Sequence, residues 1–181
     1  LVLSTLHTND APSAVTRLLD LGVPSYLIHS TVLGIMAQRL VRTLCPNCKA
    51  PEPISQSDWN ALVGTFNIPK PDHIYRPVGC LECRNTGFFG RQAIFEWMDS
   101  SSEIRSLILK NASTDLIRDS ARRAGMKTLS EDGRRLVEEG ITTIEEVLSV
   151  TTVHEMESDK VAAEGRAAAA NGAPARSEEH T

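Results

Sequence analysis

The four cysteines of the chain fall into two close pairs, Cys45-Pro-Asn-Cys48 and Cys80-Leu-Glu-Cys83. Two intervening residues allow both thiolates of a pair to turn toward one point, so two such pairs can supply the tetrahedral four-sulfur shell that structural Zn2+ prefers. Because a shell of four thiolates has no open coordination position, such a metal would have no catalytic role. It would instead stabilise the fold by closing a loop too polar to bury a core of its own.

Two other interpretations of the cysteines are open at this point. One pair could be redox-active, although the other pair would then be unexplained. The cysteines could also be buried without a metal, or joined in disulfides. The stretch between the pairs is longer than is usual in a zinc ribbon, which weakens the match to small zinc fingers but not to a zinc-closed loop. In the reducing cytosol, paired cysteines more often bind metal than form disulfides.

A histidine lies in a polar turn near the start of the chain. The apolar run Leu1 to Thr5 predicts a buried β-strand, and His7 follows it directly. In open α/β sheets, ligands bind at the carboxyl ends of the strands. There His7 could donate a hydrogen bond to a phosphate oxygen, while Thr5, Thr8 and Asn9 could orient water or a neighbouring group. The alternative is a turn whose polar residues only cap the next helix.

Composition and charge indicate a globular domain. The chain has 181 residues and a formal net charge of -4, which gives no electrostatic reason to expect nucleic-acid binding. No apolar run approaches the roughly 18 residues of a membrane-spanning helix, and no basic, apolar leader resembles a signal peptide. The chain opens with Leu1 and not with Met, so we expect it to be a fragment.

Two helices are expected to follow the histidine turn. Asp10 or Asn9 can cap the first, Pro12 suits its first turn, and Gly22 ends it. The second is predicted from Ser25 to Met36, and it should be buried because it is apolar nearly all round.

The cysteine segment lies between two strand-like runs, Leu40 to Leu44 and Gln92 to Met98. Between the cysteine pairs, one short helix is expected around Asp58 to Phe66. This arrangement indicates a zinc knob inserted into a larger α/β core and not a separate terminal domain.

The chain after Ser101 is expected to be helical. Thr128-x-x-Glu131 and Thr143-x-x-Glu146 each match a capping box, in which a hydroxyl and a carboxylate satisfy free backbone N–H groups at a helix start. From residue 154 to 181 the apolar periodicity ends, and this tail is predicted to be disordered.

The histidine turn, Leu3-Ser4-Thr5-Leu6-His7-Thr8-Asn9-Asp10, strongly resembles the histidine box of the type II secretion and type IV pilus ATPases. The similarity runs in order from about Leu1 to Thr152. Its further motifs are Gly34-Ile35-Met36-Ala37-Gln38-Arg39-Leu40-Val41-Arg42, Gly90-Arg91-Gln92-Ala93-Ile94-Phe95-Glu96 and Gly140-Ile141-Thr142-Thr143-Ile144-Glu145-Glu146-Val147.

The resemblance implies an α/β fold that is the C-terminal part of a RecA-like P-loop ATPase domain. Its implied divisions are part of the ATPase core with the histidine box (1–44), a tetracysteine zinc-binding insertion (45–88), the returning core strand with a C-terminal helical subdomain (89–153), and the tail (154–181).

The resemblance also implies roles for individual residues. His7 is the histidine-box residue that approaches the γ-phosphate of ATP. Weaker candidates for nucleotide or intersubunit contacts are Thr5, Thr8, Asn9, Arg17, Arg39 and Arg42. The metal ligands are the four cysteines, with Zn2+ as a structural ion and ATP with Mg2+ bound by the full-length protein.

The implied whole protein is a homo-hexamer at the cytoplasmic face of the inner membrane. There it would convert ATP hydrolysis into movement of platform proteins for pilus or pseudopilus assembly. The cysteine insertion favours an assembly motor over a retraction motor. Hydrolysis also needs a G-x-x-x-x-G-K-[ST] loop. The sequence contains none, so we expect that loop upstream of Leu1 and the fragment alone to be inactive.

Two other classes of function compete with the motor. A zinc-ribbon module could bind nucleic acid or protein, but the cysteine loop mixes basic residues with acidic ones and is nearly neutral. A purely structural partner protein could use the apolar stretch Ser25 to Ala37 as its interface.

Overall fold

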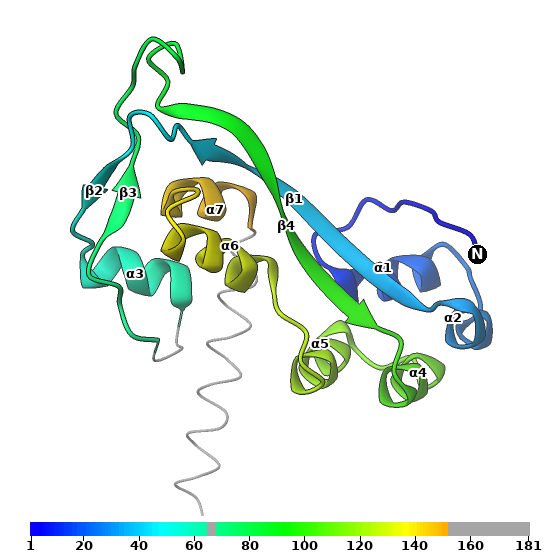
Figure 1. Cartoon of the computed structure of the whole chain (residues 1–181). Helices are drawn as coiled ribbons and strands as arrows, with labels where there is room; N and C mark the ends of the chain where they lie inside the picture. Colours follow the sequence, from blue (N-terminus) through cyan, green and yellow to red (C-terminus); the bar gives the residue numbers. More distant parts are fainter. Residues whose placement is uncertain (65–67, 152–181) are drawn as a thin grey trace, which may run out of the picture.

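The computed structural model describes residues 1–64 and 68–151 and shows a mixed α/β arrangement (Figure 1). In chain order the elements are α1 (Ala11–Asp20), α2 (Ser25–Thr31), β1 (Gly34–Leu44), β2 (Ala50–Glu52), α3 (Gln56–Val63), β3 (Ile74–Arg76), β4 (Phe88–Asp99), α4 (Ser102–Leu109), α5 (Thr114–Arg123), α6 (Leu129–Glu138) and α7 (Ile144–Val150). None of the helices in the described part of the chain is long and apolar enough to cross a membrane.

A long antiparallel ribbon of β1 and β4 runs through the molecule. It pairs Gly34 with Asp99 at one end and Arg42 with Arg91 toward the other, where the register shifts before Leu44. The helices α1, α2, α4 and α5 gather at the first end, and α3, α6, α7 and the small β2–β3 sheet lie toward the other (Figure 1). Both strands are longer than the sequence predicted, but they flank the cysteine segment as expected.

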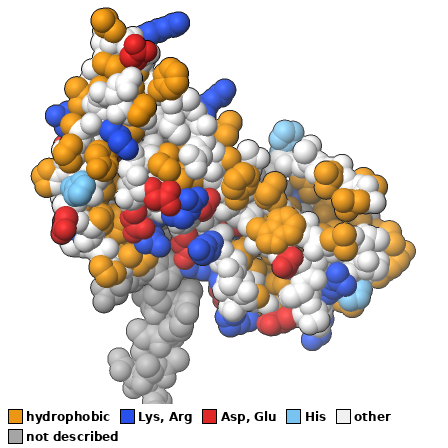
Figure 2. Space-filling model, viewed as in Figure 1, with side chains coloured by type: hydrophobic (Ala, Val, Ile, Leu, Met, Phe, Trp, Pro, Cys, Tyr) orange, Lys and Arg blue, Asp and Glu red, His pale blue; other side chains and the backbone are white. Residues whose placement is uncertain are grey.

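The two faces of the ribbon differ in burial. Side chains alternate between the faces of a strand. On β4, Ile94, Glu96 and Met98 are buried, whereas Phe95 and Trp97 are 42% and 51% exposed. Figure 2 shows hydrophobic side chains gathered around the middle of the ribbon and toward α1 and α2. The inner face therefore joins the main core while the outer face stays open in this chain.

The predicted helix from Ser25 to Met36 is wrong in its second half. The structure ends α2 at Thr31 and starts β1 at Gly34, and Ile28 is the buried residue of the helix. Pairing with β4 overrides local helix propensity here, because the backbone from Gly34 onward finds its hydrogen-bond partners in another strand. A Cβ on Gly34 would lie 2.6 Å from the Trp97 ring, so glycine permits the close cross-strand packing.

The predicted buried strand at Leu1 to Thr5 is also wrong in this structure. These residues form no strand, and the side chains of Leu1, Val2 and Leu3 are 88% exposed or more. A strand is stabilised by backbone pairing with a neighbour, and the described part of the chain places none beside this segment.

Helix capping is predicted correctly at two sites and incompletely at a third. Asp10 caps α1, and Thr128 with Glu131 forms the predicted capping box of α6. The Thr143 hydroxyl caps α7 as expected, but Glu146 does not complete a capping box. Its carboxylate instead accepts a hydrogen bond from the backbone N–H of Arg42. The predicted disordered tail at 154–181 lies outside the described residues.

We expect Ile94→Ala to lower the free energy of unfolding of the chain by about 2–5 kcal/mol, the usual cost of truncating a fully buried isoleucine. Ile94 is 0% exposed on the inner face of β4. The matched control is Phe95→Ala on the opposite face, which should cost clearly less. Urea unfolding of both variants measures the difference, and equal losses would contradict the assignment of the faces.

Candidate metal centre and histidine turn

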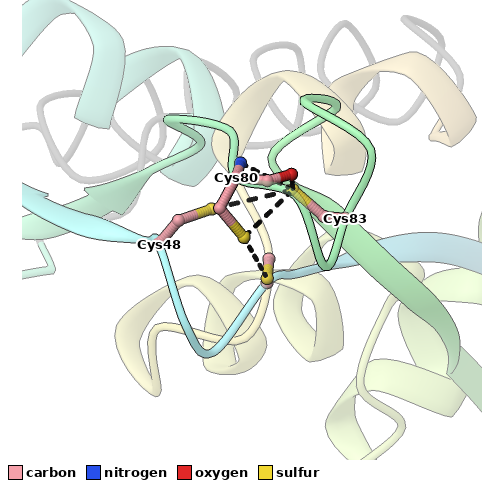
Figure 3. A group of neighbouring side chains, drawn as sticks. Cys48, Cys80 and Cys83 are labelled. Carbon is pink, nitrogen blue, oxygen red and sulfur yellow. Dashed lines mark hydrogen bonds between the residues drawn. The ribbon is translucent and has the colours of Figure 1, made fainter.

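The structure brings the four cysteine sulfurs into one cluster (Figure 3). The Sγ–Sγ distances are 3.9 Å for Cys45–Cys80, 3.8 Å for Cys48–Cys83 and 3.7 Å for Cys80–Cys83, and all four atoms lie within 4.8 Å of one another. A regular tetrahedron with metal–sulfur bonds of roughly 2.3 Å has edges of about 3.8 Å. The sulfurs are therefore spaced as a tetrahedral thiolate site requires, and all four cysteines are free of disulfides.

The ends of the long ribbon position the two cysteine pairs. The first pair follows β1 directly and the second precedes β4, and the Cys45 N–H donates to the Gly87 carbonyl at 2.9 Å. The second pair turns back through Asn85 and Gly87, which have φ of 60° and 75°. This left-handed backbone favours asparagine and glycine.

Backbone N–H groups point at the sulfurs and favour thiolates. The N–H groups of Cys80 and Gly87 donate to the Cys83 sulfur at 3.2 Å each, and the Gly79 N–H donates to Cys48 at 3.3 Å. Burial raises the pKa of the Cys83 thiol, but these donors outweigh it and lower the pKa to about 6. At Cys45, burial dominates and raises the pKa to about 11. A metal ion at the cluster requires all four thiols to lose their protons.

Lys49 links the first cysteine pair to the loop between α6 and α7. Its Nζ donates to the Gly140 carbonyl at 2.7 Å and lies 4.6 Å from the centre of the Tyr75 ring. Gly140 has φ of 67°, and a Cβ there would lie 2.5 Å from the same ring. Lys49 thus joins the segment after the first cysteine pair to β3 and to the α6–α7 loop.

A second set of contacts fastens the end of β1 to the same loop. The Leu44 N–H donates to the Ile141 carbonyl at 2.7 Å, and the Thr142 hydroxyl donates to the Arg42 carbonyl at 2.8 Å. The Glu146 carboxylate accepts from both the backbone N–H and the guanidinium of Arg42. The stretch that leads into the first cysteine pair is therefore held by the C-terminal helices.

The histidine turn lies beside the middle of the ribbon, away from the cysteine cluster. His7, Thr5 and Asn9 are exposed there and Thr8 is half-buried. The Arg39 guanidinium, which extends from β1, donates to the Thr8 and Asn9 carbonyls at 3.3 and 3.1 Å. The structure thus brings one of the predicted arginines to the turn and leaves the His7 side chain open to a ligand.

The other two predicted arginines lie elsewhere. Arg17 is exposed on α1. Arg42 pairs with α7 and covers the Phe88 ring, 4.1 Å from its centre. Arg39 lies six positions before Cys45 along the extended strand, a length of about 20 Å. The histidine turn and the cysteine cluster are therefore two sites and not one.

Sequence reasoning missed the groups that support the histidine turn. The Ala11 N–H donates to the Glu96 carboxylate of β4, and the guanidinium of Arg118 on α5 pairs with Asp10. The sequence does indicate that Glu96 is buried. The residues two positions before and after it are apolar and lie on the same face of the strand. The pairing of Arg118 with a residue 108 positions away left no local pattern.

Comparison with known proteins identifies the family. Residues 1–149 match the model of the family described as "Type II/IV secretion system protein". The chain belongs to this family. Over 150 residues it is 47% identical to the type IV pilus assembly ATPase TfpB of Acinetobacter baylyi, and over 151 residues it is 46% identical to the type II secretion system protein E of Pseudomonas aeruginosa. The PilB pilus assembly ATPase of Myxococcus xanthus is 42% identical over 156 residues.

These alignments cover 83% of this chain but only 26%, 30% and 27% of the three relatives. The chain thus spans less than a third of their length. The predicted resemblance to secretion and pilus ATPases is confirmed at the level of the family. The relatives are both pilus assembly and type II secretion proteins, so the family alone does not choose between the two systems.

We expect the chain to bind one thiophilic divalent ion and to lose it in Cys83→Ser. At a free metal concentration a thousand times Kd, binding only to the folded state would stabilise the chain by about 4 kcal/mol. Metal content and thermal unfolding with and without chelator measure both effects. The matched control is Leu81→Ser, because Leu81 lies between two ligands and is 90% exposed. Equal metal content in all three proteins would contradict the site.

We expect Glu146→Gln to destabilise the chain modestly, by less than about 1 kcal/mol for the partly exposed ion pair itself. The hydrogen bond from Arg42 lowers the pKa of Glu146. A carboxylate with a lowered pKa stabilises the fold above its unfolded pKa, and this contribution is lost as the pH falls through the folded value. The difference from wild type should therefore be larger at pH 7 than at pH 3. Urea midpoints of the wild type and the variant at the two pH values measure this difference, and Glu145→Gln at an exposed position is the control. A stability difference that grows as the pH falls would refute the pairing.

Proposed function

We propose that this chain is the C-terminal part of a hexameric motor ATPase that couples ATP hydrolysis to assembly of a pilus or pseudopilus, and so to protein secretion. The observation that carries the proposal is the family match over residues 1–149, with relatives named as pilus assembly ATPases. The motor would work at the cytoplasmic face of the inner membrane, against membrane platform proteins. The cysteine element further supports an assembly motor.

The proposed domain division follows the path of the chain. Residues 1–44 and 89–153 would belong to a RecA-like core and its helical subdomain, with 45–88 inserted between them. In support, β1 and β4 pair along most of their length although the cysteine segment separates them in sequence. A pair of strands that continues across an intervening segment is the pattern that an insertion at a hairpin end produces.

In this proposal His7 meets the γ-phosphate of ATP. Phosphoryl transfer needs donors that stabilise charge on the phosphate oxygens. An exposed imidazole on a turn, with its backbone anchored by Arg39, can donate such a hydrogen bond. Thr5 and Asn9 are exposed nearby in sequence and could orient water. The phosphate-cradling loop would come from the rest of the protein, because this sequence contains no G-x-x-x-x-G-K-[ST].

The cysteine cluster would hold a structural Zn2+. Four thiolates at tetrahedral spacing suit this ion and leave no position for substrate. Bound there, the metal would supply a closed cross-link between the segment after β1 and the segment before β4. Its contribution would be to stability and not to hydrolysis.

We expect His7→Ala in the full-length protein to lower kcat for ATP hydrolysis about 10- to 100-fold with a much smaller effect on KM, because the donor acts mainly on charge that develops in the transition state. Phosphate release from the purified hexamer is the measurement. His73→Ala is the control, because His73 is exposed and lies beside Tyr75 near the cysteine end of the molecule.

The same assay on residues 1–181 alone should show no magnesium-dependent hydrolysis. Magnesium-dependent ATP hydrolysis by this chain alone would contradict the proposal that hydrolysis needs a phosphate-binding loop from the rest of the protein. A kcat for His7→Ala equal to that of wild type would remove His7 from the site.

A further inference from the structure

The first backbone N–H of α1 is held by a carboxylate from the middle of the long ribbon. The Ala11 N–H donates to Glu96 Oε1 at 2.8 Å, and Glu96 is only 2% exposed. Burying a carboxylate is costly unless it is hydrogen-bonded. Glu96 lies on the inner face of β4 and Ala11 follows the histidine turn directly, so this contact ties the exit of the turn to the ribbon.

A second backbone N–H at the start of α1 is also engaged. The Asp10 carboxylate accepts from the Ser13 N–H at 2.8 Å, and Pro12 has no N–H to offer. A helix N-terminus with free N–H groups is a common phosphate site, but here the N–H groups of Ala11 and Ser13 are engaged within the chain. These two groups are therefore not free to bind a phosphate.

A third charged group comes from α5. The Arg118 guanidinium pairs with Asp10 at 2.9 Å and with Asp115 at 2.7 Å. Burial alone would lower the pKa of Arg118, but these two carboxylates outweigh it and raise the pKa above the ordinary value. The hydroxyls of Thr16 and Thr114 add a hydrogen bond of 2.6 Å between α1 and α5. The beginning of α1 is thus fixed to two separate elements through buried or half-buried charges.

We propose that Glu96 and Arg118 are positioning residues for His7, and that they act by fixing the start of α1 and with it the histidine turn. The inference rests on the proposed function, in which His7 meets a phosphate. His7 lies in a turn without regular secondary structure, so its backbone must be held by contacts from other elements. Arg39 holds the turn from the side through two carbonyls, and Glu96 and Arg118 hold its exit. Misplacing a reacting group by about 1 Å can cost on the order of 100-fold in rate.

The test uses the full-length protein with Glu96→Ala, Glu96→Gln, His7→Ala and the double variant His7→Ala/Glu96→Ala. We expect Glu96→Ala to lower kcat about 10- to 100-fold while KM for ATP changes little. Glu96→Gln should recover most of the loss, because an amide oxygen accepts the same N–H. The double variant should have the same kcat as His7→Ala alone, because there is no imidazole left for Glu96 to position.

Arg118 provides a second variant that does not place a cavity under the ribbon. Arg118→Met removes the ion pair to Asp10 and should lower kcat in the same way. Its matched control is Arg123→Met on the same helix, because Arg123 is 67% exposed and pairs with the exposed Glu103. If Glu96→Ala does not fold, the same comparison is made with Arg118→Met, in the wild-type protein and in the His7→Ala background.

The outcomes separate this inference from the proposed function. A low kcat for His7→Ala, with Glu96→Ala and Arg118→Met at wild-type kcat, would overturn the positioning role alone. The positioning role would also be overturned if substitution of Glu96 or Arg118 lowered kcat by the same factor in the wild-type and His7→Ala backgrounds. The two residues would then act on stability or on another group. A wild-type kcat for His7→Ala would mean that the proposed role of His7 is wrong.

Discussion

The backbone pairing of β1 with β4 is the interaction on which the rest of the structure depends. An isolated two-stranded ribbon is at best marginally stable in water, so its edges and inner face need partners. On one edge the Phe95 N–H donates to Asp132 of α6, and on the other the Arg42 N–H donates to Glu146 of α7. The same ribbon holds the histidine turn through Arg39 and carries the cysteine pairs where its strands meet the intervening segment. The helices thus stabilise the ribbon, and the ribbon joins the two sites.

Local signals were sufficient for the parts of the fold whose chemistry is local. The spacing within each cysteine pair predicted one cluster of sulfurs, and the capping residues Asp10 and Thr128 predicted two helix starts. Local signals failed where a strand competes with a helix. From Ser25 to Met36 the apolar pattern favoured one buried helix, but from Gly34 onward pairing with β4 determines the backbone. At Leu1 to Thr5 the β-prone run has no neighbouring strand in the described structure, so its pattern alone does not make it a strand.

The support of the histidine turn could not be predicted, because its contacts join residues far apart in sequence. The turn itself was recognised by its resemblance to a family motif, and the family is confirmed. Glu96 and Arg118 lie 85 and 108 positions from their partners. Glu146 was expected to complete the capping box of α7, but its carboxylate pairs with Arg42 on β1. Here too a contact between residues far apart in sequence replaced the local one.

The register of the ribbon connects the two sites without any direct contact between them. Side chains alternate along a strand, so a slip of one residue would turn Glu96 to the outer face and bring Trp97 inward. The ladder is irregular between Arg42 and Leu44, next to the cysteines. A metal ion held by both cysteine pairs would fix the two strands relative to each other at this point. The closed thiolate cluster would then protect the geometry of the histidine turn through the strand alignment, although its own chemistry takes no part there.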